Sequence, residues 1–406
     1  MVTAEFNPFA PGMLANPYPM YQALRQFAPI YWSELMDSWI LTRYEDVDFV
    51  LTDPRFSADR GSARNRFAEM VKQQQEDFGP FSLAQTMLTS DPPEHTRLRR
   101  LVSKAFTPRA VEDLRPRIQQ IVDELLEGVH AGAEFELVST LAYPLPVIVI
   151  AEMLGVPATD REKFKHWSDE IVATLGGPTV PQDLIARARQ AIEELAVYLS
   201  DHIADRRQNP RNDLISGLVA AEEQGQVLSE QEIFATAILL LVAGNETTTH
   251  LISNSVLSLL RNPDELQKLR DDPSLAANAV DEVLRYDAPV QMALRTARED
   301  IEIGGKTIPR GQQALVLLAS ANRDPEQFLA PDEFDITRTA NHHLAFGFGI
   351  HFCLGAALAR LEGEIAFRAL VRRFRGLELM TETPEYKENI VNRGLRVLPV
   401  GFSAID

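Results

Sequence analysis

The spacing of apolar and polar residues along the chain predicts a mainly helical protein. Apolar side chains recur every three or four positions over residues 108–129 and 181–203, which is typical of helices with one buried face. Short apolar stretches bounded by turn residues predict a hairpin and three further strand regions: residues 29–41, 301–309, 314–319 and 395–402. No internal repeat or long Gly/Ser linker divides the chain. We therefore expect one domain over residues 1–406, a large helical body with a small β-rich subregion.

The clearest single helix is predicted to begin after Ser229. Ser229 and Glu232 have the spacing of a capping box, in which each side chain accepts a hydrogen bond from the other residue's backbone N–H. The helical pattern continues to Arg261, because Asn262 and Pro263 are typical of the start of a new helix. A helix of this length is roughly 50 Å long, so we expect it to cross the molecule and to be partly buried.

The middle of this helix has an unusual composition. Residues 243–249 read AGNETTT, which places a glycine and three β-branched residues where strong helix formers are expected. In one interpretation the glycine permits close packing, and the threonine hydroxyls donate to carbonyls four residues earlier. In the other, the helix is loosened beside a functional site, where Glu246 and Thr247 supply an acid and a hydroxyl for proton movement.

The composition excludes several classes of protein. The chain has 58 acidic and 40 basic residues, a formal charge of −18, whereas nucleic-acid binding depends on clustered Lys and Arg. Its longest apolar stretch, residues 233–244, is shorter than the ~20 residues that span a bilayer, so we expect no membrane anchor. One cysteine in 406 residues rules out an intramolecular disulfide and favours a reducing, cytoplasmic location.

That cysteine lies in a segment with its own chemistry. Residues 346–355 read FGFGIHFCLG and are followed by a run of strong helix formers. Gly347 and Gly349 allow the backbone to fold tightly, and Cys353 then precedes a helix N-terminus. The helix dipole and free amide hydrogens there are expected to lower the pKa of the thiol. A thiolate in this position suits a metal ligand or a nucleophile.

Four interpretations of this segment follow from the residues. A lone cysteine is often an inert, buried packing residue. A phosphate-binding loop is disfavoured, because the third glycine and the Lys-Ser/Thr pair are missing. A thiolate ligand of haem iron needs a rigid, glycine-bounded loop and an apolar wall for the porphyrin. A zinc site matches no standard ligand spacing, and its candidate ligands are His342, His343, His351 and Cys353.

The cysteine segment resembles the haem-binding signature of the cytochrome P-450 superfamily. The matching positions are Phe346, Gly349, His351, Cys353 and Gly355. The AGNET sequence of residues 243–247 resembles the oxygen-activating motif of the same family. The resemblance covers essentially the entire chain and is closest to the soluble bacterial branch. It implies the cytochrome P-450 fold and haem b, iron protoporphyrin IX, with the thiolate of Cys353 as the metal ligand.

Two further segments resemble family motifs. Glu282 and Arg285 match the ExxR motif, and Arg338 lies in a segment that resembles the one carrying its partner arginine. From the residues alone, a Glu and an Arg one helical turn apart predict a solvated ion pair worth a few tenths of a kcal/mol. The resemblance implies instead a structural triad of Glu282, Arg285 and Arg338 behind the cysteine loop.

The resemblance also implies residues that hold the haem propionates by charge pairing. These residues are His95, Arg99, Arg295 and His351. On residue pattern alone, His95 and Arg99 lie four apart near a helix start and would be expected to face water.

The activity implied by the resemblance is insertion of one oxygen atom from O2 into an organic substrate. Gly244 would make room for oxygen, and Glu246 and Thr247 would manage the protons. Electrons would arrive from a separate ferredoxin or flavodoxin with its reductase. Residues 97–117 contain seven basic residues against Glu112 and Asp113, a local charge of +5. This segment is either a solvated helix face or a docking patch for an acidic electron donor.

The substrate pocket is predicted by position and is mostly apolar, which suits a terpenoid, macrolide, steroid or fatty acid. Its candidate residues, which could equally pack the core, are Leu83, Met87, Leu88, Leu239, Ala243, Val290, Met292 and Ala293. Other functions stay open: a peroxide-driven haem oxygenase or isomerase, and a non-catalytic haem or zinc-binding sensor. The Glu246–Thr247 pair disfavours the peroxide-driven enzyme.

Overall fold

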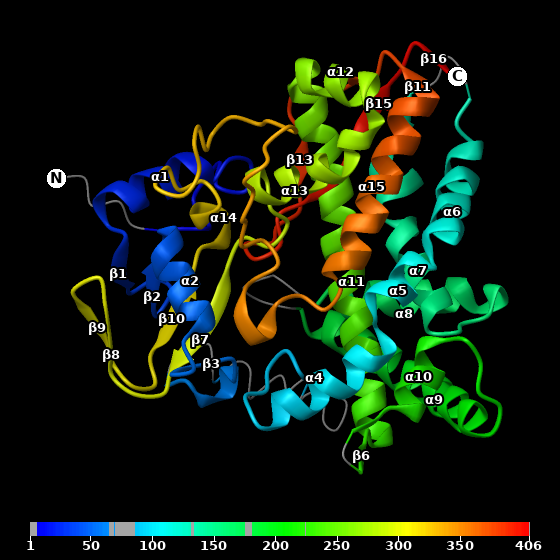
Figure 1. Cartoon of the computed structure of the whole chain (residues 1–406), viewed down its shortest axis with the longest axis horizontal. Helices are drawn as coiled ribbons and strands as arrows, with labels where there is room; N and C mark the ends of the chain where they lie inside the picture. Colours follow the sequence, from blue (N-terminus) through cyan, green and yellow to red (C-terminus); the bar gives the residue numbers. More distant parts are fainter. Residues whose placement is uncertain are drawn as a thin grey trace.

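A larger helical body and a smaller β-rich part make up the computed structural model of the chain (Figure 1). The structure describes residues 6–64, 69, 86–130, 134–174, 181–223 and 225–405. In Figure 1 the β-rich part lies on the left, with the blue N-terminal elements beside yellow strands from the second half of the chain. The mainly helical architecture expected from the residue pattern is confirmed.

The helices follow the predicted periodicity with one exception. The helical structure expected over residues 181–203 and 108–129 is confirmed, but the second segment forms two helices with a short break between them. Pro116, in the first turn of the second, has no N–H to donate to the carbonyl four residues earlier. The helices in the described ranges are α1 (Tyr18–Phe27), α2 (Tyr44–Thr52), α4 (Glu94–Ala105), α5 (Pro108–Glu112), α6 (Arg115–Glu127), α7 (Pro144–Met153), α8 (Arg161–Val172), α9 (Gln182–Gln208), α10 (Leu214–Ala220), α11 (Glu230–Arg261), α12 (Pro263–Asp271), α13 (Ala276–Tyr286), α14 (Leu318–Ala321) and α15 (Ala356–Arg373).

The strands are short and form several small sheets. The largest has the order β1-β2-β10-β7-β3, in which β10 runs parallel to β2 and the other neighbours are antiparallel. The described strands are β1 (Ile30–Ser33), β2 (Ser38–Leu41), β3 (Phe56–Ser57), β4 (Phe135–Glu136), β5 (Glu222–Glu223), β6 (Gln226–Val227), β7 (Ala293–Ala297), β8 (Ile301–Ile303), β9 (Lys306–Ile308), β10 (Gln313–Val316), β11 (Phe374–Arg375), β12 (Glu378–Leu379), β13 (Glu385–Tyr386), β14 (Leu395–Val397), β15 (Pro399–Gly401) and β16 (Ala404–Ile405).

Three of the four predicted strand regions are confirmed. The hairpin over residues 29–41 is β1 and β2, and residues 301–309 form the β8–β9 hairpin. Residues 395–402 form two strands, because β14 pairs with β13 whereas β15 pairs with β12 and β4. The strand expected over residues 314–319 is wrong in its second half, where the backbone turns into α14 after Val316.

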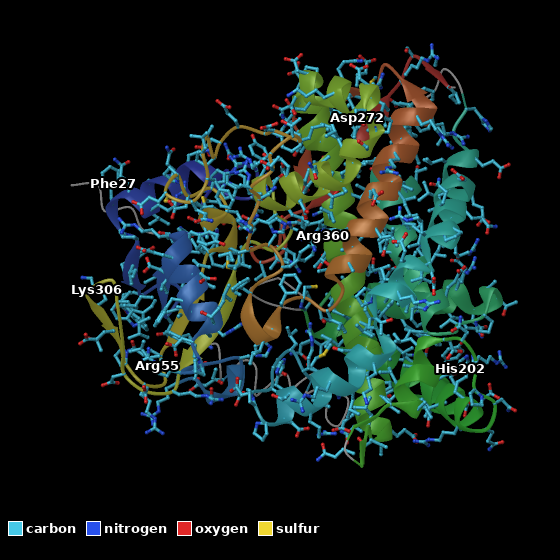
Figure 2. The ribbon with its side chains drawn as sticks, in the orientation of Figure 1. Phe27, Arg55, His202, Asp272, Lys306 and Arg360 are labelled. Atoms are coloured by element: carbon cyan, nitrogen blue, oxygen red, sulfur yellow. The ribbon has the colours of Figure 1, made fainter. Side chains whose placement is uncertain are left out.

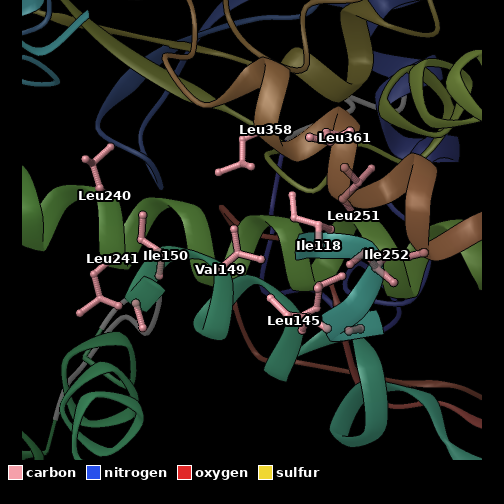
Figure 3. Close-up of a cluster of buried hydrophobic side chains, with 14 of the residues drawn as sticks. Ile118, Leu145, Val149, Ile150, Leu240, Leu241, Leu251, Ile252, Leu358 and Leu361 are labelled. Atoms are coloured by element: carbon pink, nitrogen blue, oxygen red, sulfur yellow. The ribbon is translucent and has the colours of Figure 1, made fainter. Parts of the chain in front are cut away.

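Helix α11 is the axis of the helical body. Its predicted capping box is present, with Ser229 and Glu232 bonded in both directions, and the helix ends at Arg261 as expected. Figure 3 shows its apolar side chains packed against those of α6, α7 and α15. Full burial of each such side chain contributes roughly 1.5–3 kcal/mol. None of the helices in the described ranges is long and apolar enough to cross a membrane.

Candidate active site

The loop that carries Cys353 is held by its backbone. The Cys353 N–H donates to the carbonyl of Phe346 at 3.0 Å, which closes the loop on itself. Gly347 and Gly349 have φ values of +66° and +70°, in the left-handed region that glycine adopts without strain. A Cβ on Gly349 would also lie only 2.9 Å from the Leu51 carbonyl oxygen of α2. Both glycines are therefore required by the path of the loop, as the sequence predicts.

The sulfur of Cys353 lies at the start of α15. Solvent reaches the side chain, but the surrounding protein excludes most of the water that would stabilise a thiolate. Burial therefore raises the pKa of the thiol, although backbone N–H groups of Gly355 and Ala356 and the guanidinium of Arg99 lower it. The expected net lowering is wrong, because desolvation outweighs the helix N-terminus. A metal cation reverses this balance, since it deprotonates a coordinating thiol.

Arg360 of α15, labelled in Figure 2, fixes the loop to the helical body. Its guanidinium carbon lies 4.8 Å from the centre of the Phe346 ring, and its Nε donates to Asp281 of α13 at 2.7 Å. His343 lies on the same carboxylate, with Nε2 3.3 Å from the Asp281 oxygen. Among the described residues, no three His, Cys, Asp or Glu side chains come together as metal ligands. The zinc site is therefore not assembled.

Four basic side chains gather near the cysteine, and they are the four that the resemblance assigns to the haem propionates. The rings of His95 and His351 lie 4.3 Å apart. Burial lowers the pKa of His95 and that of His351, the latter to about 3, and the guanidinium of Arg295 adds to both shifts. Burial also lowers the pKa of Arg99, and nearby Cys353 opposes that shift.

This basic cluster fits an anionic ligand. His95 is buried, which contradicts the expectation that it faces water, and within the described part of the chain neither ring nitrogen has a hydrogen-bond partner. Buried polar atoms without partners are uncommon in proteins. Two arginines and two histidines beside one thiol match the two carboxylates and the metal of a haem group. The donor set therefore fits the cofactor implied by the sequence.

One narrow face of α11 is accessible. Between Thr236 and Leu259 every residue is buried except Ala243, Gly244 and Thr247, which share one side of the helix. The Thr247 hydroxyl donates to the Ala243 carbonyl at 2.6 Å, so the back-bonding interpretation is confirmed. Among the described residues, a Cβ on Gly244 would meet nothing within 4 Å, so the interpretation that this glycine permits close packing is wrong there.

Glu246 is buried beside this face and has partners that the sequence reasoning missed. Its carboxylate accepts a hydrogen bond from Asn392 Nδ2 at 3.2 Å and lies 3.5 Å from Lys387 Nζ. Burial raises the pKa of Glu246, while both partners lower it. Because they lie more than 140 positions away along the chain, no local pattern could have linked them to Glu246.

The predicted triad is assembled behind the cysteine loop. The Arg285 guanidinium donates two hydrogen bonds to Glu282, each of 2.8 Å, and Arg338 Nε lies 3.2 Å from the same carboxylate. Glu282 and Arg285 are fully buried, so the alternative of a solvated ion pair is wrong. Arg285 also donates to the carbonyls of Pro331 and Glu333, which fixes the segment leading towards Cys353.

The candidate substrate residues are spread over several packing clusters. Met87 and Leu239 belong to the largest core cluster, whereas Met292 packs in another one with N-terminal residues. Val290 and Ala293 pack at the edge of a third cluster. Leu88 is exposed, as is Ala243, and Leu83 lies outside the described residues. Their role in substrate binding stays a prediction.

The basic segment over residues 97–117 is partly neutralised within the protein. Its exposed cations include Arg100, Lys104 and Arg109. Three others have carboxylate partners: Arg97 with Glu94 and Glu232, Arg115 with Glu112 and Glu364, and Arg117 with Glu124 and Glu152.

Comparison with known proteins agrees with this site. The family model described as cytochrome P-450 matches residues 20–400. The cytochrome P-450 monooxygenase PikC of Streptomyces venezuelae is 43% identical over 395 residues, covering 95% of this chain and 91% of that protein. The vitamin D(3) 25-hydroxylase of Pseudonocardia autotrophica is 42% identical over 404 residues, covering 98% and 96%.

A solved structure extends the likeness to the fold. The cytochrome P-450 PksS of the Bacillus subtilis 168 bacillaene polyketide synthase superposes with a TM-score of 0.89. It is 40% identical in sequence, and the match covers 98% of this chain and 100% of that chain. The chain therefore belongs to the cytochrome P-450 family.

Proposed function

We propose that Cys353 binds the haem iron of this monooxygenase and that Gly244, Glu246 and Thr247 serve the insertion of oxygen into a small apolar substrate. Membership of the family makes the protein a haem-thiolate oxidoreductase that uses O2 and electrons from a redox partner. The assignment of residues to roles is our inference. One observation carries it: the sole cysteine of the chain lies beside a basic cluster that contains a buried histidine without hydrogen-bond partners in the described residues.

The protein side of the cofactor site follows from the geometry. When bound, the haem supplies an iron atom that activates dioxygen, and a cysteine thiolate ligand favours O–O cleavage. Cys353 would hold the iron, since the closed loop and the two left-handed glycines fix its backbone. His95, Arg99, Arg295 and His351 would bind the propionates. Phe346, Gly349 and Gly355 would shape the loop.

On the accessible face of α11, Thr247 acts as a hydrogen-bond acceptor. A hydroxyl has one proton to donate, and that of Thr247 goes to the Ala243 carbonyl. The lone pairs of Thr247 Oγ1 can therefore accept a hydrogen bond from a proton donor at this face. One turn away, Gly244 leaves space that none of the described side chains fills. Glu246, whose pKa is raised by burial, is suited to accept and release protons.

The finer identities of substrate and partner are also proposals. An apolar organic molecule is supported by the apolar character of the candidate pocket residues Met87, Leu239, Val290, Met292 and Ala293. A ferredoxin or flavodoxin with its reductase would supply the electrons, and exposed cations of the 97–117 segment suit an acidic donor. The cytoplasmic location expected from the single cysteine stays a prediction.

Spectroscopy and product analysis test the proposal together. The protein expressed with hemin should bind haem, and its reduced carbonyl adduct should absorb like that of a thiolate-ligated haem. With reduced ferredoxin and isotopically labelled O2, one labelled oxygen atom should enter the product. Cys353→Ala should lose the thiolate-type adduct and the activity, because no second cysteine exists.

Two outcomes would contradict the proposal. Colourless protein, or a carbonyl adduct like that of a histidine-ligated globin, would remove Cys353 from the metal. Turnover with hydrogen peroxide but none with reduced ferredoxin would assign the chain to the peroxide-driven class instead.

A further inference from the structure

A small cavity lies between the N-terminal segment and the loop that follows β13. Its volume is about 20 Å³, and one ordered water needs roughly 10–15 Å³. Its lining residues include Leu14, Tyr21, Met292, Lys387, Arg393 and Gly394. Arg393 holds the two walls together, because it donates to the carbonyls of Leu14 and Ala15 and pairs with Asp287 at 2.7 Å.

The same loop is pressed against α11 at the level of Glu246. A Cβ on Gly394 would overlap the imidazole ring of His250, so loop and helix are in direct contact there. Asn392 Nδ2 donates to one oxygen of the Glu246 carboxylate at 3.2 Å. The other carboxylate oxygen lies 3.5 Å from Lys387 Nζ. Two side chains of one loop therefore hold both oxygens of this buried acid.

Lys387 contacts both this buried acid and the solvent. The Lys387 side chain is 35% exposed and lines the cavity, whereas the Glu246 side chain is 7% exposed. A second titratable side chain of the described structure, His250, lies beside Glu246, with its Nε2 3.9 Å from the carboxylate. His250 is fully buried, and burial lowers its pKa to about 3, so its ring is neutral at pH 7. The cation facing Glu246 in the described structure is thus Lys387.

We propose that Lys387 is a positioning residue that admits protons from this cavity to Glu246 during monooxygenation. The inference rests on the proposed function, in which Glu246 manages the protons. The net reaction with the redox partner is RH + O2 + 2e⁻ + 2H⁺ → ROH + H2O, so each turnover draws protons from solvent. With hydrogen peroxide the reaction is RH + H2O2 → ROH + H2O, and both protons arrive with the oxidant. Only the first reaction needs the Lys387 route.

The difference between these two reactions provides the test. Lys387→Met keeps a side chain of similar length without the charge, and Lys387→Arg restores a cation. With reduced ferredoxin and O2, we expect Lys387→Met to turn over about tenfold more slowly. This loss is smaller than the ~10²-fold or greater rate contribution of a side chain that transfers the proton directly. The pH profile of Lys387→Met should move to higher pH, because Lys387 lowers the pKa of Glu246. Peroxide-driven turnover should equal that of the wild type, and Lys387→Arg should recover most of the loss.

Lys306→Met is the matched control. Lys306 is an exposed lysine of the β8–β9 hairpin at the far edge of the β-rich part (Figure 2), and its loss should leave both reactions unchanged. Wild-type ferredoxin-driven rates and pH profile in Lys387→Met would overturn the inference while leaving the proposed function intact. Equal slowing of both reactions would also overturn it, since that result indicates structural damage. A wild-type protein with neither activity would overturn the proposed function and this inference with it.

Discussion

A single hydroxyl on the accessible face of α11 tests the proton chemistry. We expect Thr247→Ala to consume O2 and release hydrogen peroxide instead of product, because the face loses the acceptor that holds a proton donor. The fold should survive, since the lost bond to the Ala243 carbonyl is one that slightly destabilises helices. The measurement is the ratio of product and peroxide to O2 consumed.

Thr249 offers a control for this substitution. Its hydroxyl makes the same kind of bond, to the Asn245 carbonyl at 2.9 Å, but the side chain is buried on the other side of the helix. Thr249→Ala should therefore keep its coupling of O2 consumption to product. Unchanged coupling in Thr247→Ala, or equal uncoupling in both variants, would count against the proton role of Thr247.

At the scale of the element, Gly244 makes helix α11 less stable but leaves its accessible face open. Alanine is favoured over glycine in a helix interior by about 1 kcal/mol, and a Cβ here would meet no atom of the described part of the chain within 4 Å. We expect Gly244→Ala to raise the free energy of unfolding by about that amount and to lower turnover with O2, because the methyl group occupies the accessible face. Denaturant unfolding and steady-state rates measure the two effects. A variant that is both more stable and fully active would show that the space is not used.

The elements also show what local patterns can predict. The start of α11 could be predicted from Ser229 and Glu232, because both capping partners lie within one turn. The helical pattern over residues 108–129 is confirmed but is interrupted just before Pro116, whose effect on the preceding turn outweighs apolar periodicity. The strand predicted over residues 314–319 ends at Val316, because the backbone then turns into α14, where the Ala321 N–H donates to the Leu317 carbonyl.

In the candidate site, too, features that depend on neighbouring residues could be predicted and features that depend on the whole fold could not. The cysteine loop could be predicted because its glycines, its sulfur and the helix start are contiguous in the sequence. The pKa of Cys353 could not, because burial depends on the whole fold and reverses the local effect of the helix N-terminus. The contact of Glu246 with Lys387 could not be predicted either, since it connects the middle of α11 with a loop near the C-terminus.

At the scale of the whole molecule, the basic segment stands out against a charge of −18. Arg97, Arg115 and Arg117 hold helices together through carboxylate partners, so they contribute little net field. The exposed cations Arg100 and Arg109 are therefore the better candidates for attracting an acidic redox partner. Complementary charges act mainly on the rate of encounter and are screened by salt.

We expect Arg100→Glu combined with Arg109→Glu to slow reduction by an acidic ferredoxin about tenfold at low ionic strength, the lower end of known steering effects. The deficit should shrink as salt is added, because a Debye length of about 10 Å at 0.1 M screens exposed charges. Peroxide-driven turnover should not change, since it needs no partner. Stopped-flow reduction over a salt series measures the effect, with Lys306→Glu combined with Arg310→Glu, two exposed positions at the β8–β9 hairpin, as the charge-matched control. Equal slowing by the hairpin variant would assign the effect to net charge, and no slowing by either would place the docking surface elsewhere.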